Sequence, residues 1–227
     1  MNDLLEKSCT PIEKGSAPLD EAAWKPLLEQ LGESWEVSEG TLVREFVFPA
    51  FETGLDFVNQ TGGLAEQEGH HPELALDRRK VRVSLRTHDV DGLSENDFIL
   101  AAKITDAVMG LATARMVDVN AMKGDSPTSA GAEKLGEETV AEQVKTLGEG
   151  WSVGEEGRLE RSYAPADYVA ALTLVNKIGT LAKERRHHPA LLLTPGQLKV
   201  SLFTYPVEGL TKLDFELAAA IEGAAKG

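Results

Sequence analysis

The sequence contains a single cysteine, Cys9, among 227 residues. A lone cysteine cannot form an internal disulfide, and no CxxC or Cys/His spacing typical of a zinc site is present. No apolar run approaches the ~20 residues that a membrane-spanning helix requires. The first residues also lack the basic and apolar regions of a secretory signal. These absences predict a soluble, cytoplasmic protein without structural disulfides.

Positive charge is scarce as well. Lys and Arg number 23 against 37 Asp and Glu, which gives a net charge of −14. A chain this acidic repels phosphate backbones, so we expect no binding to nucleic acid. Hydrophobic residues make up 42% of the sequence, which is enough for two ordinary cores.

The most informative feature that is present is an internal repeat. All five histidines lie in two segments that correspond at a constant shift of 117 residues. His-His-Pro at 70–72 corresponds to His-His-Pro at 187–189, and a strand-like stretch ending at His88 corresponds to one ending at Tyr205. The repeat predicts two domains of about 100 residues each, a common domain size.

The domain limits follow from composition. We place the domains at 18–112 and 134–227, after a flexible tail at 1–17. The stretch 113–133 is predicted to be a linker, because it is rich in Gly, Ser and Pro and carries no apolar periodicity.

Each copy shows the same predicted order of elements, α-β-β-α-β-β-α. One helix is predicted from about Phe51 to Gln67, although Gly62 and Gly63 weaken it by roughly 1 kcal/mol each. Alternation from Val81 to His88 predicts a strand with one apolar face. Short strand pairs imply a four-stranded antiparallel sheet with helices on one face, so the fold class is α+β.

The histidines are the candidates for chemistry. Histidine titrates nearest to neutral pH and therefore suits proton transfer. Adjacent residues in an extended chain point to opposite sides, so His70 and His71 are poorly placed to share an ion and we expect no metal. The alternatives stay open: His-His-Pro as a solvated turn, and Asp97 as a helix cap in the box that begins at Ser94.

These residues resemble the pterin-4a-carbinolamine dehydratase family, over nearly all of 18–112 and 134–224. The resemblance is carried by Glu66-xxx-His-His-Pro, by Thr87-His88 and by Gly-Leu-Ser-xx-Asp97. It implies dehydration of 4a-hydroxytetrahydropterin to quinonoid dihydropterin without metal or organic cofactor. It also implies a catalytic set of three histidines, His70, His71 and His88. Two further residues, Glu66 and Asp97, are implied to contact the pterin or orient a histidine.

The second copy departs from the family pattern. Tyr205 replaces His88, and Lys183 replaces Glu66. Tyrosine, with a reference pKa of ~10, is a poor base at neutral pH. We expect a weaker second site, nearly inactive, that retains His187, His188 and Asp214 and binds a pterin or another anion through Lys183, Arg185 and Arg186.

A second class of function stays open. Proteins similar to this family act as binding modules, including assembly factors for ribulose bisphosphate carboxylase, in which case the partner is a client protein. The resemblance also implies that subunits pair edge to edge. We therefore predict an intramolecular pseudo-dimer with one eight-stranded sheet, because a linker of roughly 20 residues spans on the order of 60 Å. Further association between chains is left open.

Overall fold

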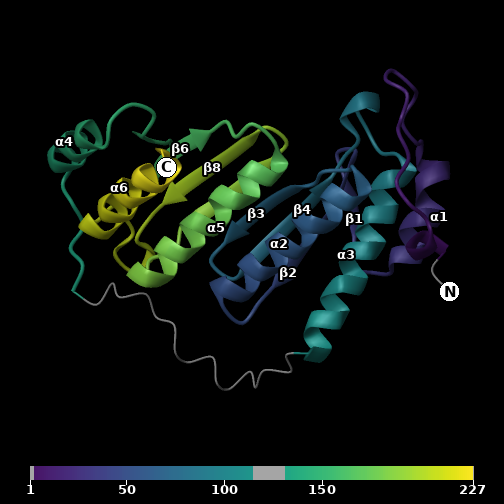
Figure 1. Cartoon of the computed structure of the whole chain (residues 1–227), viewed down its shortest axis with the longest axis horizontal. Helices are drawn as coiled ribbons and strands as arrows, with labels where there is room; N and C mark the ends of the chain where they lie inside the picture. The colour runs from purple at the N-terminus through teal and green to yellow at the C-terminus, as the bar shows by residue number, and fades with distance from the viewer. Residues whose placement is uncertain (1–2, 115–130, 227) are drawn as a thin grey trace.

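The computed structural model describes residues 3–114 and 131–226 (Figure 1). The predicted order of elements is confirmed in both copies. The first copy contains η1 (Asp3–Glu6), α1 (Glu21–Leu31), β1 (Glu36–Ser38), β2 (Thr41–Val47), α2 (Phe51–Glu68), β3 (Glu73–Asp77), β4 (Lys80–Leu85), η2 (His88–Val90) and α3 (Glu95–Ala114). The second contains α4 (Glu137–Leu147), β5 (Ser152–Val153), β6 (Leu159–Tyr163), α5 (Tyr168–Arg185), β7 (Ala190–Thr194), β8 (Gln197–Leu202), η4 (Tyr205–Val207) and α6 (Lys212–Lys226).

All eight strands form one antiparallel sheet in the order β1-β2-β4-β3-β7-β8-β6-β5. At the centre of the β3–β7 pairing, Ala75 lies opposite Leu192, its own counterpart in the repeat. Asn59 of α2 and Asn176 of α5 are also counterparts, and their side chains exchange hydrogen bonds of 2.8 and 2.9 Å. The predicted eight-stranded sheet is confirmed, and each domain covers the edge strand that the other would leave exposed.

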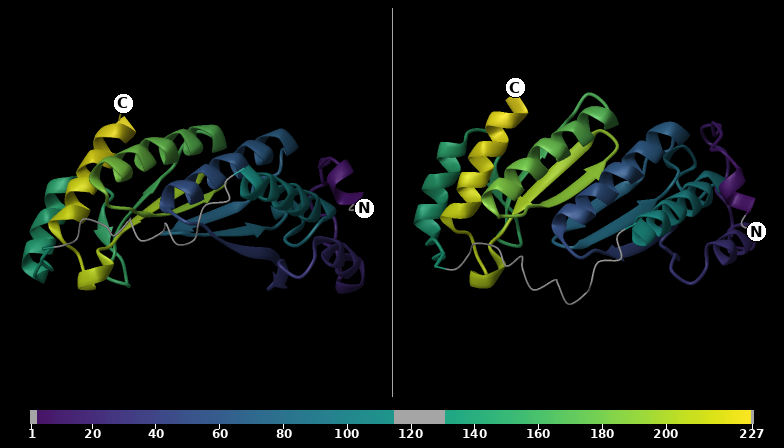
Figure 2. Two further views of the ribbon diagram at one scale, coloured as in Figure 1. Left: turned by 90° about the horizontal axis from the view of Figure 1, so that it is seen from below. Right: turned by 60° about the horizontal axis from the view of Figure 1, so that its bottom comes forward.

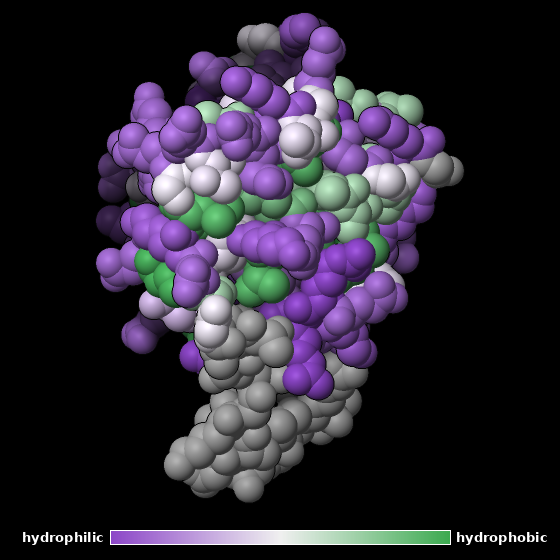
Figure 3. All heavy atoms as spheres, turned by 90° about the vertical axis from the view of Figure 1, so that its left-hand side faces the viewer, coloured by the Kyte–Doolittle hydropathy of each residue, from purple (hydrophilic) through white to green (hydrophobic). Residues whose placement is uncertain are grey.

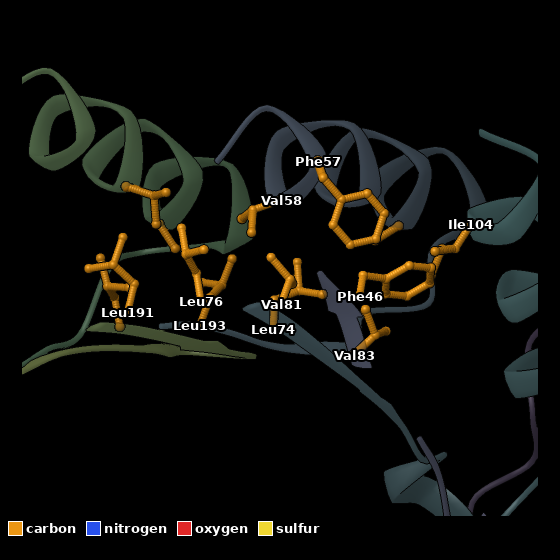
Figure 4. Packing of buried hydrophobic residues seen from close by; sticks show 14 of the residues in the cluster. Phe46, Phe57, Val58, Leu74, Leu76, Val81, Val83, Ile104, Leu191 and Leu193 are labelled. Atoms are coloured by element: carbon orange, nitrogen blue, oxygen red, sulfur yellow. The ribbon is translucent and has the colours of Figure 1, made fainter. Parts of the chain in front are cut away.

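The helices α2, α3, α5 and α6 cover one face of the sheet (Figure 2), while α1 packs against α3 and α4 against α6. On β4, Val81 and Val83 are fully buried beneath the helices, and Arg82 is exposed on the opposite face. Buried side chains continue across the domain boundary, from Phe57 to Leu191 (Figure 4). The two domains therefore share one continuous core.

Helices α2 and α5 approach each other where each carries a glycine. A Cβ atom on Gly62 would lie 2.6 Å from Leu172 Cδ1, and one on Gly179 would lie 2.2 Å from Leu55 Cδ2. Both distances are below any normal Cβ contact. The glycines that lower the helix propensity of this region therefore let the two domains pack closely.

The N-terminal segment differs from its prediction. The composition of 1–17 predicts a flexible tail, but the described part packs on the first domain. Leu4 is 1% exposed. The Asn96 side chain accepts a hydrogen bond from the backbone N–H of Thr10 (3.1 Å) and donates one to its carbonyl oxygen (2.7 Å). The polar composition of the segment did not reveal this packing, because it depends on one buried apolar side chain and on hydrogen bonds to residues distant in the chain, such as Asn96.

The outer end of the second domain carries α4, which packs through half-buried apolar residues, namely Val140, Val144 and Leu147. Figure 3 shows this end, with apolar residues lying between hydrophilic ones. Most of the predicted linker, residues 115–130, lies outside the described residues. Within 3–114 and 131–226, no helix combines the length and the apolar character needed to cross a membrane.

Candidate active site

The first histidine of the His-His-Pro unit is anchored on a buried carboxylate. Gly69 ends α2 with a left-handed backbone (φ 63°), and His70 follows it with Nε2 2.7 Å from Asp97 Oδ1. Asp97 Oδ2 accepts hydrogen bonds from the Thr87 hydroxyl and from the Ser94 backbone N–H, both at 2.8 Å. A carboxylate only accepts, so His70 Nε2 carries the hydrogen and Nδ1 is the nitrogen left for other partners.

Asp97 therefore combines the two roles that the sequence left open. Its bond to the Ser94 N–H caps the start of α3, and its bond to His70 fixes the histidine ring. The carboxylate is fully buried. Such a group is stable in a core only when hydrogen bonds compensate for its lost hydration.

The second copy repeats this arrangement. His187 Nε2 lies 2.7 Å from Asp214 Oδ1. Asp214 Oδ2 accepts from the Thr204 hydroxyl at 2.7 Å and from the Thr211 backbone N–H at 2.8 Å. The buried histidine–aspartate pair is thus common to both domains, and it does not distinguish the intact copy from the altered one.

The second histidine of the unit is more accessible and lies at the domain boundary. His71 Nε2 is 2.7 Å from Glu66 Oε1, one turn back on α2. The His71 ring packs 4.6 Å from the ring of Tyr168, which begins α5 of the second domain. The Tyr168 hydroxyl donates to the carbonyl of Pro72 at 3.4 Å. Burial, together with the Glu66 charge, raises the pKa of Tyr168, so this hydroxyl stays protonated.

His71 and His88 line the same cavity, which we call the first hollow. It measures about 580 Å³ and lies on the sheet face opposite the helices. The second domain contributes Thr194 and Pro195 to its wall. Its ionisable lining residues are both histidines, two carboxylates and two arginines: His71, His88, Glu39, Glu73, Arg82 and Arg86.

The predicted set of three histidines is only partly brought together. His70 does not line the first hollow. It lines a neighbouring cavity of about 530 Å³, beneath the N-terminal segment, together with Glu66. Glu66 also bonds to His71, so this carboxylate links the two cavities. The accessible pair is therefore His71 and His88. His70 is hydrogen-bonded to Asp97 and lines the neighbouring cavity.

The cavity that holds His70 also contains the only cysteine. The Cys9 backbone N–H donates to Glu68 Oε2 at 2.8 Å, and Glu68 forms an ion pair with Lys103. Burial, and then the Glu68 charge, raises the pKa of the Cys9 thiol to about 12. A thiol with so high a pKa is a poor nucleophile at neutral pH.

The altered copy has a different cavity, which we call the second hollow. It measures about 440 Å³ and contains His187, His188 and Tyr205. His188 stacks on Phe51 of the first domain at 4.5 Å, whereas the corresponding pair of His71 and Tyr168 is tilted by 45°. None of the basic residues expected here, Lys183, Arg185 and Arg186, lines this cavity. They lie at the end of α5, so anion binding through them stays a prediction that the lining of this cavity does not test.

The residues that cross between the domains were not predicted from the sequence. Tyr168 is the clearest example, since it contacts His71 from a position 97 residues away in the chain. A signal was present: Phe51 and Tyr168 are counterparts in the repeat and both begin a helix. Within 3–114 and 131–226, no group of three or more His, Cys, Asp and Glu side chains is placed to hold a metal ion.

Comparison with known proteins agrees with this arrangement of domains. The sequence model of the family described as "Pterin 4 alpha carbinolamine dehydratase" matches residues 17–107 and 133–224. The chain therefore belongs to the pterin-4-alpha-carbinolamine dehydratase family, and it contains two copies of the family domain.

Individual relatives each match about half of the chain. A protein of Alkaliphilus metalliredigens named "Putative pterin-4-alpha-carbinolamine dehydratase" is 47% identical over 105 residues, covering 46% of this chain and 95% of its own. A protein of the same name from Rickettsia canadensis is 44% identical over 109 residues, covering 48% and 100%. A solved structure of a "transcriptional coactivator/pterin dehydratase" from Brucella melitensis is 31% identical, with a TM-score of 0.38, and covers 39% of this chain and 96% of that one.

Proposed function

We propose that this protein dehydrates 4a-hydroxytetrahydropterin to quinonoid dihydropterin, using the histidines of its first domain. The observation that carries the proposal is the pair of accessible histidines, His71 and His88, in one cavity to whose wall the second domain contributes. Membership of the family supports a pterin as the substrate class.

The reaction needs two proton transfers. The bond between C4a and the hydroxyl oxygen breaks, and the oxygen leaves as water after it accepts a proton. The N5–H proton departs, and its electron pair forms the C4a=N5 double bond. A histidine side chain can both donate and accept a proton, so two histidines are suited to supply the one proton and remove the other.

The residues around this pair have supporting roles in the proposal. Glu66 holds the His71 ring through its hydrogen bond to Nε2, and Tyr168 of the second domain packs against the same ring. His70 and Asp97 fix the turn that carries His71. A general acid or base must be held within hydrogen-bonding reach of the substrate, so losing this support lowers the rate even when the histidine remains.

The test is a pterin turnover assay with matched variants of the full chain. We expect H71A/H88A to lower the rate by roughly 10²-fold or more, the usual scale for losing a general acid or base. The control is H188A/Y205A, the same two positions in the altered copy, which we expect to stay within a factor of about two. The triple variant H70A/H71A/H88A should be at least as impaired as H71A/H88A.

Two outcomes would contradict the proposal. Wild-type turnover in the triple variant would remove the histidines from the mechanism. Absence of turnover in the folded wild-type protein would instead favour the second class of function, a binding module for a client protein such as an assembly factor.

A further inference from the structure

The second hollow differs from the first in its charge. In the lining of the first hollow, two carboxylates, Glu39 and Glu73, balance two arginines. Among the described residues that line the second there is no Asp or Glu, but there are two arginines, Arg78 and Arg79, from the β3–β4 turn of the first domain. The chain as a whole has a net charge of −14, so the charge of this cavity lining is opposite in sign to that of the chain.

The nearest carboxylates of the described chain are already engaged. Asp77 accepts hydrogen bonds from the Tyr205 hydroxyl at 3.1 Å on both oxygens, and Arg78 Nε lies 3.8 Å from it. Glu52 lies 3.7 Å from His188, and Asp214 holds the other histidine of the pair. No ion pair joins Arg79 to an acidic residue within 3–114 and 131–226, so its charge is not neutralised there.

Aromatic rings form two walls of this cavity. His188 and Phe51 stack at 4.5 Å with an interplanar angle of 12°. Phe203 and Tyr205 meet edge to face at 5.3 Å. The Arg78 guanidinium lies 4.5 Å from the centroid of the Tyr205 ring, a cation–π contact that holds it at the rim. The position of the arginine is further defined by a left-handed backbone at Arg78 (φ 53°), uncommon for a residue other than glycine.

The starts of the corresponding helices α2 and α5 also differ in their capping. Ala50 begins α2 beside the second hollow without a side-chain cap, so the first backbone N–H groups of an 18-residue helix lack one. Its counterpart, Asp167, caps α5 by accepting from the Ala170 N–H at 2.7 Å. An uncapped helix start favours an anion, which adds to the effect of the arginines.

From these observations we infer that the second hollow is a binding site for a planar aromatic anion, a ring that bears a carboxylate or phosphate group. The ring would lie between the aromatic walls, and the anionic group would face the two arginines and the start of α2. The inference does not depend on the proposed function, because it concerns the cavity that lacks the third histidine.

The test uses three probes at pH 7: pterin-6-carboxylate, its uncharged parent pterin, and inorganic phosphate. Binding is measured by calorimetry in the H71A/H88A background, which removes the two histidines of the first hollow. We expect pterin-6-carboxylate to bind at least about tenfold more tightly than either pterin or phosphate, because it alone combines ring and charge. The affinity should fall as salt is raised.

Variants then locate the site. R78Q/R79Q should lower the affinity for pterin-6-carboxylate by about tenfold, which is the scale of two partly exposed ion pairs. The affinity for pterin should stay unchanged. R79Q alone should show part of this loss without touching the Asp77–Tyr205 contact. The control K183Q/R185Q removes the same charge from the end of α5, outside the hollow, and should leave the affinity within a factor of about two.

The inference would be overturned if pterin and pterin-6-carboxylate bound equally. It would also be overturned if the control variant lost as much affinity as R78Q/R79Q, since a nonspecific charge effect would then explain the binding. Circular dichroism of each variant establishes that a loss of affinity is not a loss of fold.

Discussion

Two adjacent glycines of α2 provide a test of how the domains pack. A Cβ atom on Gly63 would meet no heavy atom within 4 Å, whereas a Cβ atom on Gly62 would lie 2.6 Å from Leu172 of the second domain. Replacing glycine by alanine inside a helix stabilises the helix by about 1 kcal/mol when space allows. The G63A variant should therefore gain about 1 kcal/mol of stability.

The G62A variant has the same gain in helix propensity but must displace Leu172. Overpacking of this kind costs about 1–3 kcal/mol, so the net change lies between zero and a loss of about 2 kcal/mol. The two variants should then differ by about 1–3 kcal/mol. In a chain of this size, that difference corresponds to roughly 2–12 °C in Tm.

Thermal unfolding followed by circular dichroism measures the difference directly. The variant L172A removes the side chain that the new methyl group would meet, so the G62A penalty should largely disappear in the L172A background. If G62A raised Tm as much as G63A does, the close approach of α2 and α5 would be refuted.

Two further predictions concern the first domain. Cys9 should react with iodoacetamide about 10³-fold more slowly than an ordinary thiol at pH 8, because its pKa is raised from 9.0 to about 12 and the thiolate fraction falls about tenfold per unit; a normal rate would show that the N-terminal segment does not pack on the domain. H70A and H187A should both lower the free energy of unfolding by about 1–3 kcal/mol, because each removes the hydrogen bond to Oδ1 of a buried aspartate. Only H70A should also lower pterin turnover. Equal turnover in the two variants, measured well below Tm, would contradict the assignment of activity to the first domain.

Much of the fold was predictable because its signals are local. The alternation along β4 identified Val81 and Val83 as buried and Arg82 as exposed, and the structure confirms both. The helix from Phe51 was predicted within one residue at its end. The joined sheet was predicted from the resemblance to the family together with the repeat and the need to pair an edge strand.

The missed features depend on contacts between distant parts of the chain. Gly62 lowers the propensity of α2, and only the position of α5 shows that its missing side chain makes room for Leu172. The hydrogen bond between Thr10 and Asn96 likewise joins residues that are far apart in the sequence and adjacent only in the folded chain. For the site, sequence spacing grouped three histidines, but only the structure separates His70 from the cavity that the other two share.

The repeat also limits how the two copies can be compared. The first hollow takes part of its wall from Thr194 and Pro195, and His71 packs on Tyr168, so the first site includes residues of the altered domain. Expressing residues 134–227 alone would expose the edge of β7 and the face of α5 around Gly179, which β3 and α2 cover in the whole chain. A loss of activity in separated halves would therefore report lost packing as well as altered chemistry. The contribution of each copy has to be measured by paired substitutions within the intact chain, because there the shared core stays the same while the residues of one hollow change.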